Sequence, residues 1–274
     1  MPRWAVLVAI VIVVGGAILW GLHRSRTSER PASKWAPVVA VKVLNTFPHD
    51  PAAFTQGLLV DGGQFVEGTG LYDSSEVRRV DIASGAVRAR VKLDSTYFGE
   101  GLALIGDRLY QLTWREGRAF VWDRATLAPL DTLTYEGEGW GLTFDGTHLV
   151  MSDGSATLTF RDPATFQTAR TVQVTDNGQP VDQLNELEYV GGKVLANIWG
   201  GDRVAVINPA TGYVERWLAL EGLRALLQPA PARDDVLNGL AYDASTGRLF
   251  ATGKHWPLVF ELDPSALTTA PATP

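Results

Sequence analysis

Five segments of the chain share a pattern in which one polar or aromatic residue stands directly before a Gly-Leu or Glu-Leu pair. The leading residues are Gln56, Glu100, Trp140, Asn185 and Asn238. The leucines of these pairs are spaced 44, 40, 45 and 53 residues apart. Side chains that donate, accept and stack, held at equivalent positions of a repeat, can converge on one ligand and orient it.

Glu100 is the member of this set that suits proton transfer. Phe98 stands two residues before it, and alternation along a strand puts both side chains on one face. With Trp114 and Trp140 also expected nearby, the carboxyl group should lose hydration, which raises its pKa and suits it to move protons. The plainer interpretation is a glutamate that accepts hydrogen bonds from backbone amides.

An aromatic collar is expected around the polar groups. Phe54 precedes Gln56 by two residues, as in the Glu100 segment. Trp114 and Trp199 share one offset in their repeats, where a second strand would end. The competing interpretation is that these tryptophans only wedge between repeats, but a shared offset beside a polar ring favours a ligand site.

Lys254 ends a second apolar run in the last repeat. Its ammonium could hold a carbonyl or carboxylate group there, and the alternative is a solvated loop lysine. The four histidines show no metal-ligand spacing, cysteine is absent, and no G-x-S-x-G motif occurs. These observations argue against a zinc hydrolase, a disulfide framework and a serine nucleophile, so no metal ligands are assigned.

The elements that must position these residues are short strands. A period in the low forties with several strand-like runs per repeat predicts an all-β, five-bladed β-propeller at residues 38–264. Residues 38–44 form a strand run with no partner in the first repeat, while the last repeat offers only three runs. We therefore expect 38–44 to close the last blade as its outer strand. Residues 221–236 are expected to be an insertion, and 265–274 a disordered tail.

The N-terminal stretch, residues 1–22, contains an almost wholly apolar segment at 4–22 that is long enough to span a bilayer as a helix. Because no cleavage site of small residues comes after it, we expect an uncleaved anchor rather than a signal peptide, and then a polar tether at 23–37. Arginines after the segment would keep the domain in the cytoplasm by the positive-inside rule. A lone N-terminal apolar segment more often exports the domain behind it, so we expect an anchored, extracytoplasmic domain.

The net charge of −6 is unevenly distributed. Residues 1–34 carry five basic residues against one acidic, so the remainder carries −10. Such an acidic domain does not favour a phosphate backbone, and nucleic acid is not an expected partner. It would weakly attract a cation such as the terminal ammonium of a peptide. We expect a monomer.

Ten short motifs, in order between residues 38 and 263, resemble the plant and bacterial type of glutaminyl-peptide cyclotransferase (glutaminyl cyclase), a family of five-bladed propellers. The motifs are Phe47–Pro51 with Phe54–Leu58, Glu67–Tyr72, Phe98–Gly101, Leu112–Trp114, Gly139–Leu142, Leu184–Tyr189, Asn197–Trp199, Asp202-Arg203, Leu237–Gly239 and Thr252–Pro257.

This resemblance implies that the protein converts the N-terminal glutamine of peptides or proteins to pyroglutamate with loss of ammonia. It places the family's acid/base carboxylate on Glu100. The pocket residues that it implies are all present: Phe54, Gln56, Phe98, Trp114, Trp140, Asn185, Trp199 and Lys254.

In the resulting hypothesis, Glu100 shuttles a proton while Gln56, Asn185 and Lys254 steady the amide oxygen, each donor contributing about 3 kcal/mol. Asn238 is counted with the substrate-binding ring. The scheme requires no cofactor, and a structural ion in the channel is left open. Two alternatives stay open: a non-catalytic propeller that binds peptides or sugars, and a calcium-dependent, lactonase-like propeller. The latter needs several converging ligands, whereas the ring offers one carboxylate.

Overall fold

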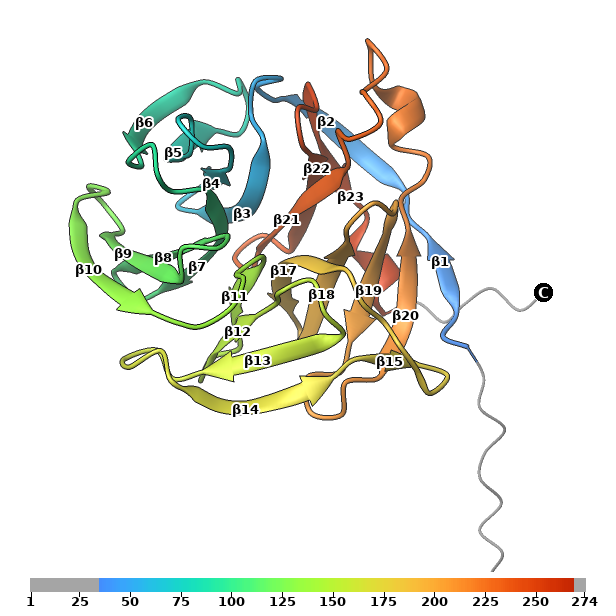
Figure 1. Cartoon of the computed structure of the whole chain (residues 1–274). Coiled ribbons are helices and arrows are strands. Elements are labelled where there is room, and N and C mark those ends of the chain that lie inside the picture. The colour runs from blue at the N-terminus through green and yellow to red at the C-terminus, as the bar shows by residue number, and fades with distance from the viewer. Residues whose placement is uncertain (1–34, 269–274) are drawn as a thin grey trace, which may run out of the picture. The chain divides into compact units, whose positions relative to one another are not determined.

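Five β-sheets stand around a common centre in the computed structural model, which describes residues 35–268 (Figure 1). Strands that are consecutive within a blade pair antiparallel, and the first strands of neighbouring blades contact each other around the ring. The propeller and its blade number are thus confirmed. The first two blades are β3 (Thr55–Asp61), β4 (Gln64–Thr69), β5 (Glu76–Asp81) and β6 (Val87–Lys92), then β7 (Gly99–Ile105), β8 (Arg108–Thr113), β9 (Arg118–Asp123) and β10 (Pro129–Thr134).

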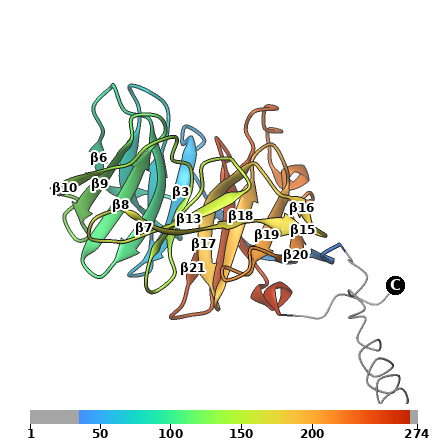
Figure 2. The same ribbon diagram turned by 60° about the horizontal axis from the view of Figure 1, so that its bottom comes forward.

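The other three blades continue the pattern. The third is β11 (Leu142–Phe144), β12 (Leu149–Met151), β13 (Thr157–Arg161) and β14 (Thr168–Gln173), and a small hairpin of β15 (Thr175–Asp176) and β16 (Gln179–Pro180) comes after it. The fourth is β17 (Leu184–Val190), β18 (Lys193–Ile198), β19 (Arg203–Ile207) and β20 (Val214–Ala219). The fifth begins with β21 (Leu237–Asp243), β22 (Arg248–Gly253) and β23 (Leu258–Leu262). Figure 2 shows the strands standing side by side between two faces of the ring.

The strand that closes the ring is not the one expected. β2 (Val43–Pro48) pairs antiparallel with β23 and completes the fifth blade, whereas β1 (Val38–Ala40) pairs parallel with β20 as a fifth strand of the fourth blade. The prediction that 38–44 closes the last blade is therefore wrong in extent, although an N-terminal strand does close it. The physical reason is that Val39, Val41 and Val43 all pack on one apolar cluster between these two blades.

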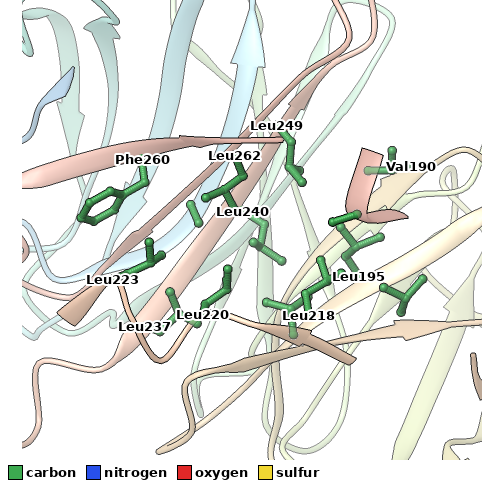
Figure 3. Packing of buried hydrophobic residues seen from close by; sticks show 14 of the residues in the cluster. Val190, Leu195, Leu218, Leu220, Leu223, Leu237, Leu240, Leu249, Phe260 and Leu262 are labelled. Atoms are coloured by element: carbon green, nitrogen blue, oxygen red, sulfur yellow. The ribbon is translucent and has the colours of Figure 1, made fainter. Parts of the chain in front are cut away.

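Each junction between neighbouring blades is filled by one cluster of buried apolar side chains. Figure 3 shows the cluster between the fourth and fifth blades, where Leu195 and Leu218 lie near Leu240 and Leu249. Alternation along each middle strand supplies such side chains to both of its faces. The apolar core therefore lies between blades, which leaves the centre of the ring free for polar groups.

Two short 3-10 helices complete the described fold. η1 (Arg224–Leu226) lies in the predicted insertion. η2 (Pro264–Leu267) begins after Asp263, whose carboxylate accepts the backbone N–H of Ser265 at 2.9 Å, and it buries Ala266. The prediction that residues 265–274 form a disordered tail is therefore wrong for 265–268, because a capping hydrogen bond and a buried side chain hold this turn in place.

The end of the expected tether also belongs to the propeller. The backbone N–H of Ala36 donates to Asp176 at 2.8 Å, and the Pro37 carbonyl accepts from the backbone N–H of Trp217 at 2.8 Å. The predicted apolar helix at 4–22 lies outside the described residues. Within 35–268, no helix is long and apolar enough to cross a membrane.

Candidate active site

The leading residues of the repeats stand at irregularities of the first strands. In four blades the pairing register between the first and second strands shifts within the span that holds the leading residue. The shifts lie between Thr55 and Gly57, Gly99 and Leu102, Leu184 and Leu187, and Leu237 and Leu240. A β-bulge re-aims the side chain that it contains and is common beside active sites. In the third blade, Trp140 precedes the strand.

The glycine after the leading residue is required by close approach of neighbouring blades. A Cβ atom on Gly57 would lie 2.7 Å from the backbone nitrogen of Leu102, and one on Gly101 would lie 2.5 Å from that of Leu142. Both contacts are with backbone, which cannot move aside cheaply. Glycine occurs in the Gly-Leu pattern because the first strands of neighbouring blades approach too closely for a larger residue.

Glu186 replaces this glycine in the fourth blade, and its buried side chain bridges three blades. Its carboxylate accepts the backbone N–H of Leu58 at 3.3 Å and that of Leu240 at 2.8 Å. Burial, and after it the charge of Glu188, raises the pKa of Glu186 well above the usual carboxyl value. Burial also raises the pKa of Glu188 to about 8, against a hydrogen bond from the Tyr242 backbone. These two carboxyls are therefore structural groups of the channel.

A cavity of about 360 Å³ brings together nine of the ten predicted site residues. Leu71, which adopts a φ of 83°, is an additional lining residue, and no feature of the repeat pattern predicts it. The complete lining is Phe54, Gln56, Leu71, Phe98, Glu100, Trp114, Trp140, Asn185, Trp199 and Lys254. A second cavity of about 540 Å³ is lined by charged and uncharged residues of the first blade and of the segment before it, and it shares only Phe54 with the first cavity.

Glu100 is buried in this cavity with one oxygen bound and one free. Its Oε1 accepts the side-chain N–H of Gln56 at 2.8 Å, and its Oε2 has no hydrogen bond with any described residue. Burial raises the pKa of Glu100 well above the usual carboxyl value; the charge of Lys254 opposes this, and Glu138 and Glu116 add to it. The raised pKa makes the Glu100 carboxylate a stronger base than an ordinary one, which suits it to accept a proton from a substrate.

Lys254 is buried beside the same group. Its Nζ lies 4.5 Å from the centre of the Phe54 ring. Burial lowers the pKa of Lys254, and the nearby Glu100 carboxylate opposes that effect. The solvated-loop interpretation of this lysine is therefore excluded, and its ammonium is available to a ligand in the cavity.

Asn238 is the predicted site residue that does not line the cavity. Its amide donates to the side-chain oxygen of Gln56 at 3.1 Å and to the carbonyl of Thr55 at 2.9 Å. Because the Gln56 oxygen accepts from Asn238, the Gln56 nitrogen must face Glu100. Asn238 therefore orients a cavity residue from behind, which corrects its assignment to the substrate-binding ring.

One carboxylate fixes the two central tryptophans. Glu138 Oε2 accepts the indole N–H of Trp114 at 2.8 Å and that of Trp140 at 2.9 Å. Arg115 donates to the other oxygen at 2.9 Å and stacks 3.6 Å from the Trp114 ring. Trp199, which is 51% exposed, lies 6.4 Å from Trp140 as the outer wall. The sequence pattern gives Glu138 little weight, because carboxylates do not recur at its position in the repeats.

Asn185 presents a second unpaired acceptor. Its side-chain Oδ1 is buried and has no hydrogen-bond partner among the described residues, as is true of Glu100 Oε2. Both atoms are therefore available to accept N–H groups of a ligand in the cavity. An amine or a primary amide held between aromatic rings fits both atoms. Within 35–268 no cluster of three or more His, Cys, Asp or Glu residues could hold a metal ion.

Comparison with known proteins agrees with this geometry. A family model described as glutamine cyclotransferase matches residues 16–263. The glutaminyl-peptide cyclotransferase of Arabidopsis thaliana is 39% identical over 266 residues, covering 95% of this chain and 83% of the plant protein. The crystal structure of Myxococcus xanthus glutaminyl cyclase is similar with a TM-score of 0.79 and 39% identity, covering 83% of this chain and 97% of the bacterial one.

Proposed function

The chain belongs to the glutamine cyclotransferase family and is a glutaminyl-peptide cyclotransferase, and we propose that Glu100 is the group that moves the proton in its reaction. The observation that carries this proposal is the free Oε2 of a buried carboxyl in an aromatic cavity. Burial raises the pKa of this carboxyl, so its carboxylate is a stronger base than an ordinary one and takes a proton from an amine more readily.

The proposed step transfers one proton between two nitrogens. The α-amine of the substrate attacks the carbonyl carbon of its own side-chain amide, and a nitrogen–carbon bond forms. Glu100 takes one proton from the attacking nitrogen and gives it to the leaving nitrogen as the old carbon–nitrogen bond breaks. The ring nitrogen keeps one hydrogen, ammonia leaves, and Glu100 returns to its starting state.

The aromatic walls supply proximity. An extended glutamine holds its amine away from its amide, whereas a cavity of about 360 Å³ between Phe54, Phe98 and Trp114 favours a folded side chain. Holding two reacting groups in contact replaces much of the entropic cost of bringing them together. The indoles can serve as walls because Glu138 fixes Trp114 and Trp140.

The hydrogen bonds of the cavity assign different roles to Gln56, Asn185 and Lys254 than the sequence predicted. Gln56 uses its nitrogen to hold Glu100, so it orients the carboxyl rather than the substrate oxygen. Asn185 offers Oδ1 as an acceptor, which suits an N–H of the substrate amine or amide. The ammonium of Lys254 is then the group that stabilises the amide oxygen as it gains negative charge.

The decisive experiment measures ammonia release from a short peptide with N-terminal glutamine. We expect Glu100→Gln to lower kcat by about 100-fold or more, the usual contribution of a positioned acid/base group. The variant keeps the size of the side chain and the acceptor for Gln56, so product affinity should persist. We also expect turnover by the unchanged chain to survive a metal chelator. Full turnover by Glu100→Gln would discard this residue as the acid/base group.

On sequence grounds alone, we further propose an extracytoplasmic domain anchored by residues 4–22, with peptides or proteins bearing N-terminal glutamine as substrates. The domain would lie on the periplasmic or secreted side, so protease added to spheroplasts, whose inner membrane is intact, should digest the propeller. Protection in spheroplasts and digestion only after lysis would instead support the orientation that the positive-inside rule favours.

A further inference from the structure

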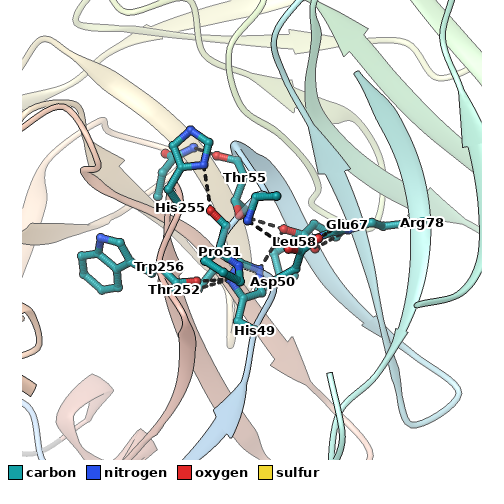
Figure 4. Close-up of polar contacts among 12 residues, drawn as sticks. His49, Asp50, Pro51, Thr55, Leu58, Glu67, Arg78, Thr252, His255 and Trp256 are labelled. Atoms are coloured by element: carbon teal, nitrogen blue, oxygen red, sulfur yellow. Dashed lines mark hydrogen bonds and ion pairs between the residues drawn. The ribbon is translucent and has the colours of Figure 1, made fainter. Parts of the chain in front are cut away.

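A buried charged network crosses the junction between the last and the first blade (Figure 4). His49, directly after the ring-closing strand β2, has a side chain that is only 2% exposed. Its Nε2 lies 3.0 Å from Oε1 of Glu67 on β4, and its Nδ1 lies 2.6 Å from the backbone carbonyl of Trp256 in the fifth blade. One imidazole thus touches both sides of the junction.

Every polar neighbour of this imidazole is an acceptor. The Trp256 carbonyl can only accept. Thr252 Oγ1, 3.5 Å from Nδ1, donates its own hydrogen to the Leu258 carbonyl at 2.9 Å and so presents a lone pair to the ring. Both ring nitrogens of His49 must therefore carry hydrogen, which makes the ring an imidazolium.

Glu67 accepts as an ionised carboxylate. Arg78 donates to its Oε2 at 2.9 Å, and Thr55 donates to its Oε1 at 2.7 Å. Although burial opposes ionisation, the charge and hydrogen bond of His49, the charge of Arg78 and the hydrogen bond of Thr55 lower the pKa of Glu67 to about 2. The remaining charges at the network are Asp50 and Glu76, whose carboxylates lie 2.8 and 3.5 Å from Nη1 of Arg78. The positive charge of Arg78 opposes the charge on His49.

The network holds two parts of the cavity. On the fifth-blade side, the Trp256 carbonyl belongs to the loop that carries Lys254, and the backbone N–H of His255 in that loop donates to the Ala53 carbonyl at 2.7 Å. On the first-blade side, Thr55 stands between two lining residues, Phe54 and Gln56. The charged network therefore sets how the two blades present their cavity residues to each other.

We propose that His49 is a positioning residue, held as an imidazolium, that ties the Lys254 loop of the last blade to the first strand of the ring. The proposal rests on the proposed function in that Lys254 and Gln56 serve the cavity. Loss of a proton would set a lone pair of the ring against an acceptor oxygen. The loop then loosens, and turnover falls at alkaline pH.

The sign of this pH dependence is set by the same contacts. Burial lowers the pKa of His49, but the charge and hydrogen bond of Glu67 outweigh it, with help from the Trp256 carbonyl, and raise the pKa above its usual value. The stabilising contribution is therefore complete at low pH and is lost as pH rises through the raised value.

The charge state can be measured without turnover. In the full chain labelled with ¹⁵N-histidine, we expect both nitrogens of His49 to give protonated chemical shifts at pH 7. The signal is assigned by its disappearance in His49→Gln, or by its displacement in Glu67→Gln if the first variant does not fold. A His49 ring with one unprotonated nitrogen at pH 7 would overturn the proposal.

The positioning role is tested on the pH profile of kcat/KM. Glu67→Gln removes the charge that holds the His49 proton, so we expect the alkaline limb to move down by about one pH unit or more. The matched control is Asp61→Asn, because Asp61 is also buried and joins Arg79 and Arg124 of two blades, at the far end of β3. The pH profile of kcat/KM for Asp61→Asn should have the same shape as that of the wild-type protein.

The outcomes separate this proposal from the proposed function. The pKa of Glu100 follows burial, Lys254, Glu138 and Glu116, and that of Lys254 follows burial and Glu100, so we attribute a limb shifted by Glu67→Gln to His49. A folded Glu67→Gln variant with an unshifted limb would refute the positioning role even if His49 is charged. Absence of turnover in the unchanged chain would instead refute the proposed function, and the ¹⁵N measurement would still decide the charge state.

Discussion

At the scale of single residues, the cavity depends on charges that act on Glu100 from opposite directions. Lys254 favours the ionised carboxylate, whereas Glu138 and Glu116 favour the protonated acid. Burial is the largest influence and sets the overall rise of the pKa. The two kinds of neighbour therefore tune the pH at which the proton shuttle works.

Replacing these neighbours should move the acidic limb of kcat in opposite directions. Lys254→Met removes the positive charge, so the pKa of Glu100 rises further and the limb moves to higher pH. Glu138→Gln removes a negative charge, so the limb moves to lower pH. Lys254→Met should also lower kcat, because the amide oxygen loses its stabilising charge. Shifts of the same sign in both variants would contradict the electrostatic account.

A second prediction at this scale concerns stability. Because burial raises the pKa of Glu188 to about 8, the folded protein binds a proton that the unfolded chain has already released. Stability should therefore decline as pH rises from about 4.5 to about 8. In Glu188→Gln this decline should be smaller, as measured by thermal unfolding at pH 5 and pH 8. Equal declines in both proteins would show that Glu188 titrates normally.

At the scale of elements, the shared position in the repeat predicts most of the cavity and misses its irregular members. Equivalent offsets place Glu100 and Trp114 correctly, because each blade presents the same end of its strands to one face. Asn238 fails because the bulge at Gly239, with a φ of 113°, turns the chain differently from the other blades. Leu71 and Glu138 have no counterpart in the other repeats, so periodicity carries no signal for them.

The convergence of the first strands can be tested with one methyl group. Gly101→Ala forces a Cβ against the backbone of Leu142, so we expect destabilisation of about 2 kcal/mol or more and loss of turnover through displacement of Glu100. Gly222→Ala is the control, because nothing lies within 4 Å of its Cβ position and its φ is not positive. Thermal unfolding and ammonia release measure both effects. A Gly101→Ala variant as stable and active as the control would disprove the required close approach.

At the scale of the whole molecule, the ring is held by its two N-terminal strands, which bind different blades. Alternating valines at residues 39, 41 and 43 predict a strand but not its partner, because the parallel pairing of β1 with β20 leaves no mark in the sequence. The blade count was predictable because the repeat covers the chain. The sequence did not predict that β1 pairs with the fourth blade while β2 pairs with the fifth.

Truncation distinguishes these two strands. A chain that begins at Val41 keeps β2 and all five blades, so it should fold with a lower melting temperature than one that begins at Trp35. A chain that begins at His49 lacks the outer strand of the fifth blade and exposes an edge, so it should aggregate or remain unfolded. Circular dichroism during heating measures the difference. Equal stability of the three chains would show that closure by β2 is dispensable.

The order of β1 and β2 along the chain has a mechanical consequence. A pulling force applied through the residues before 35 reaches the hydrogen bonds of Ala36 and Pro37 and then the three paired residues of β1. Only after those pairs separate does the load pass to β2, the strand on which the ring depends. A load that separates β1 from β20 therefore leaves β2 paired with β23, so the ring and the cavity at its centre stay closed while β1 detaches and pairs again.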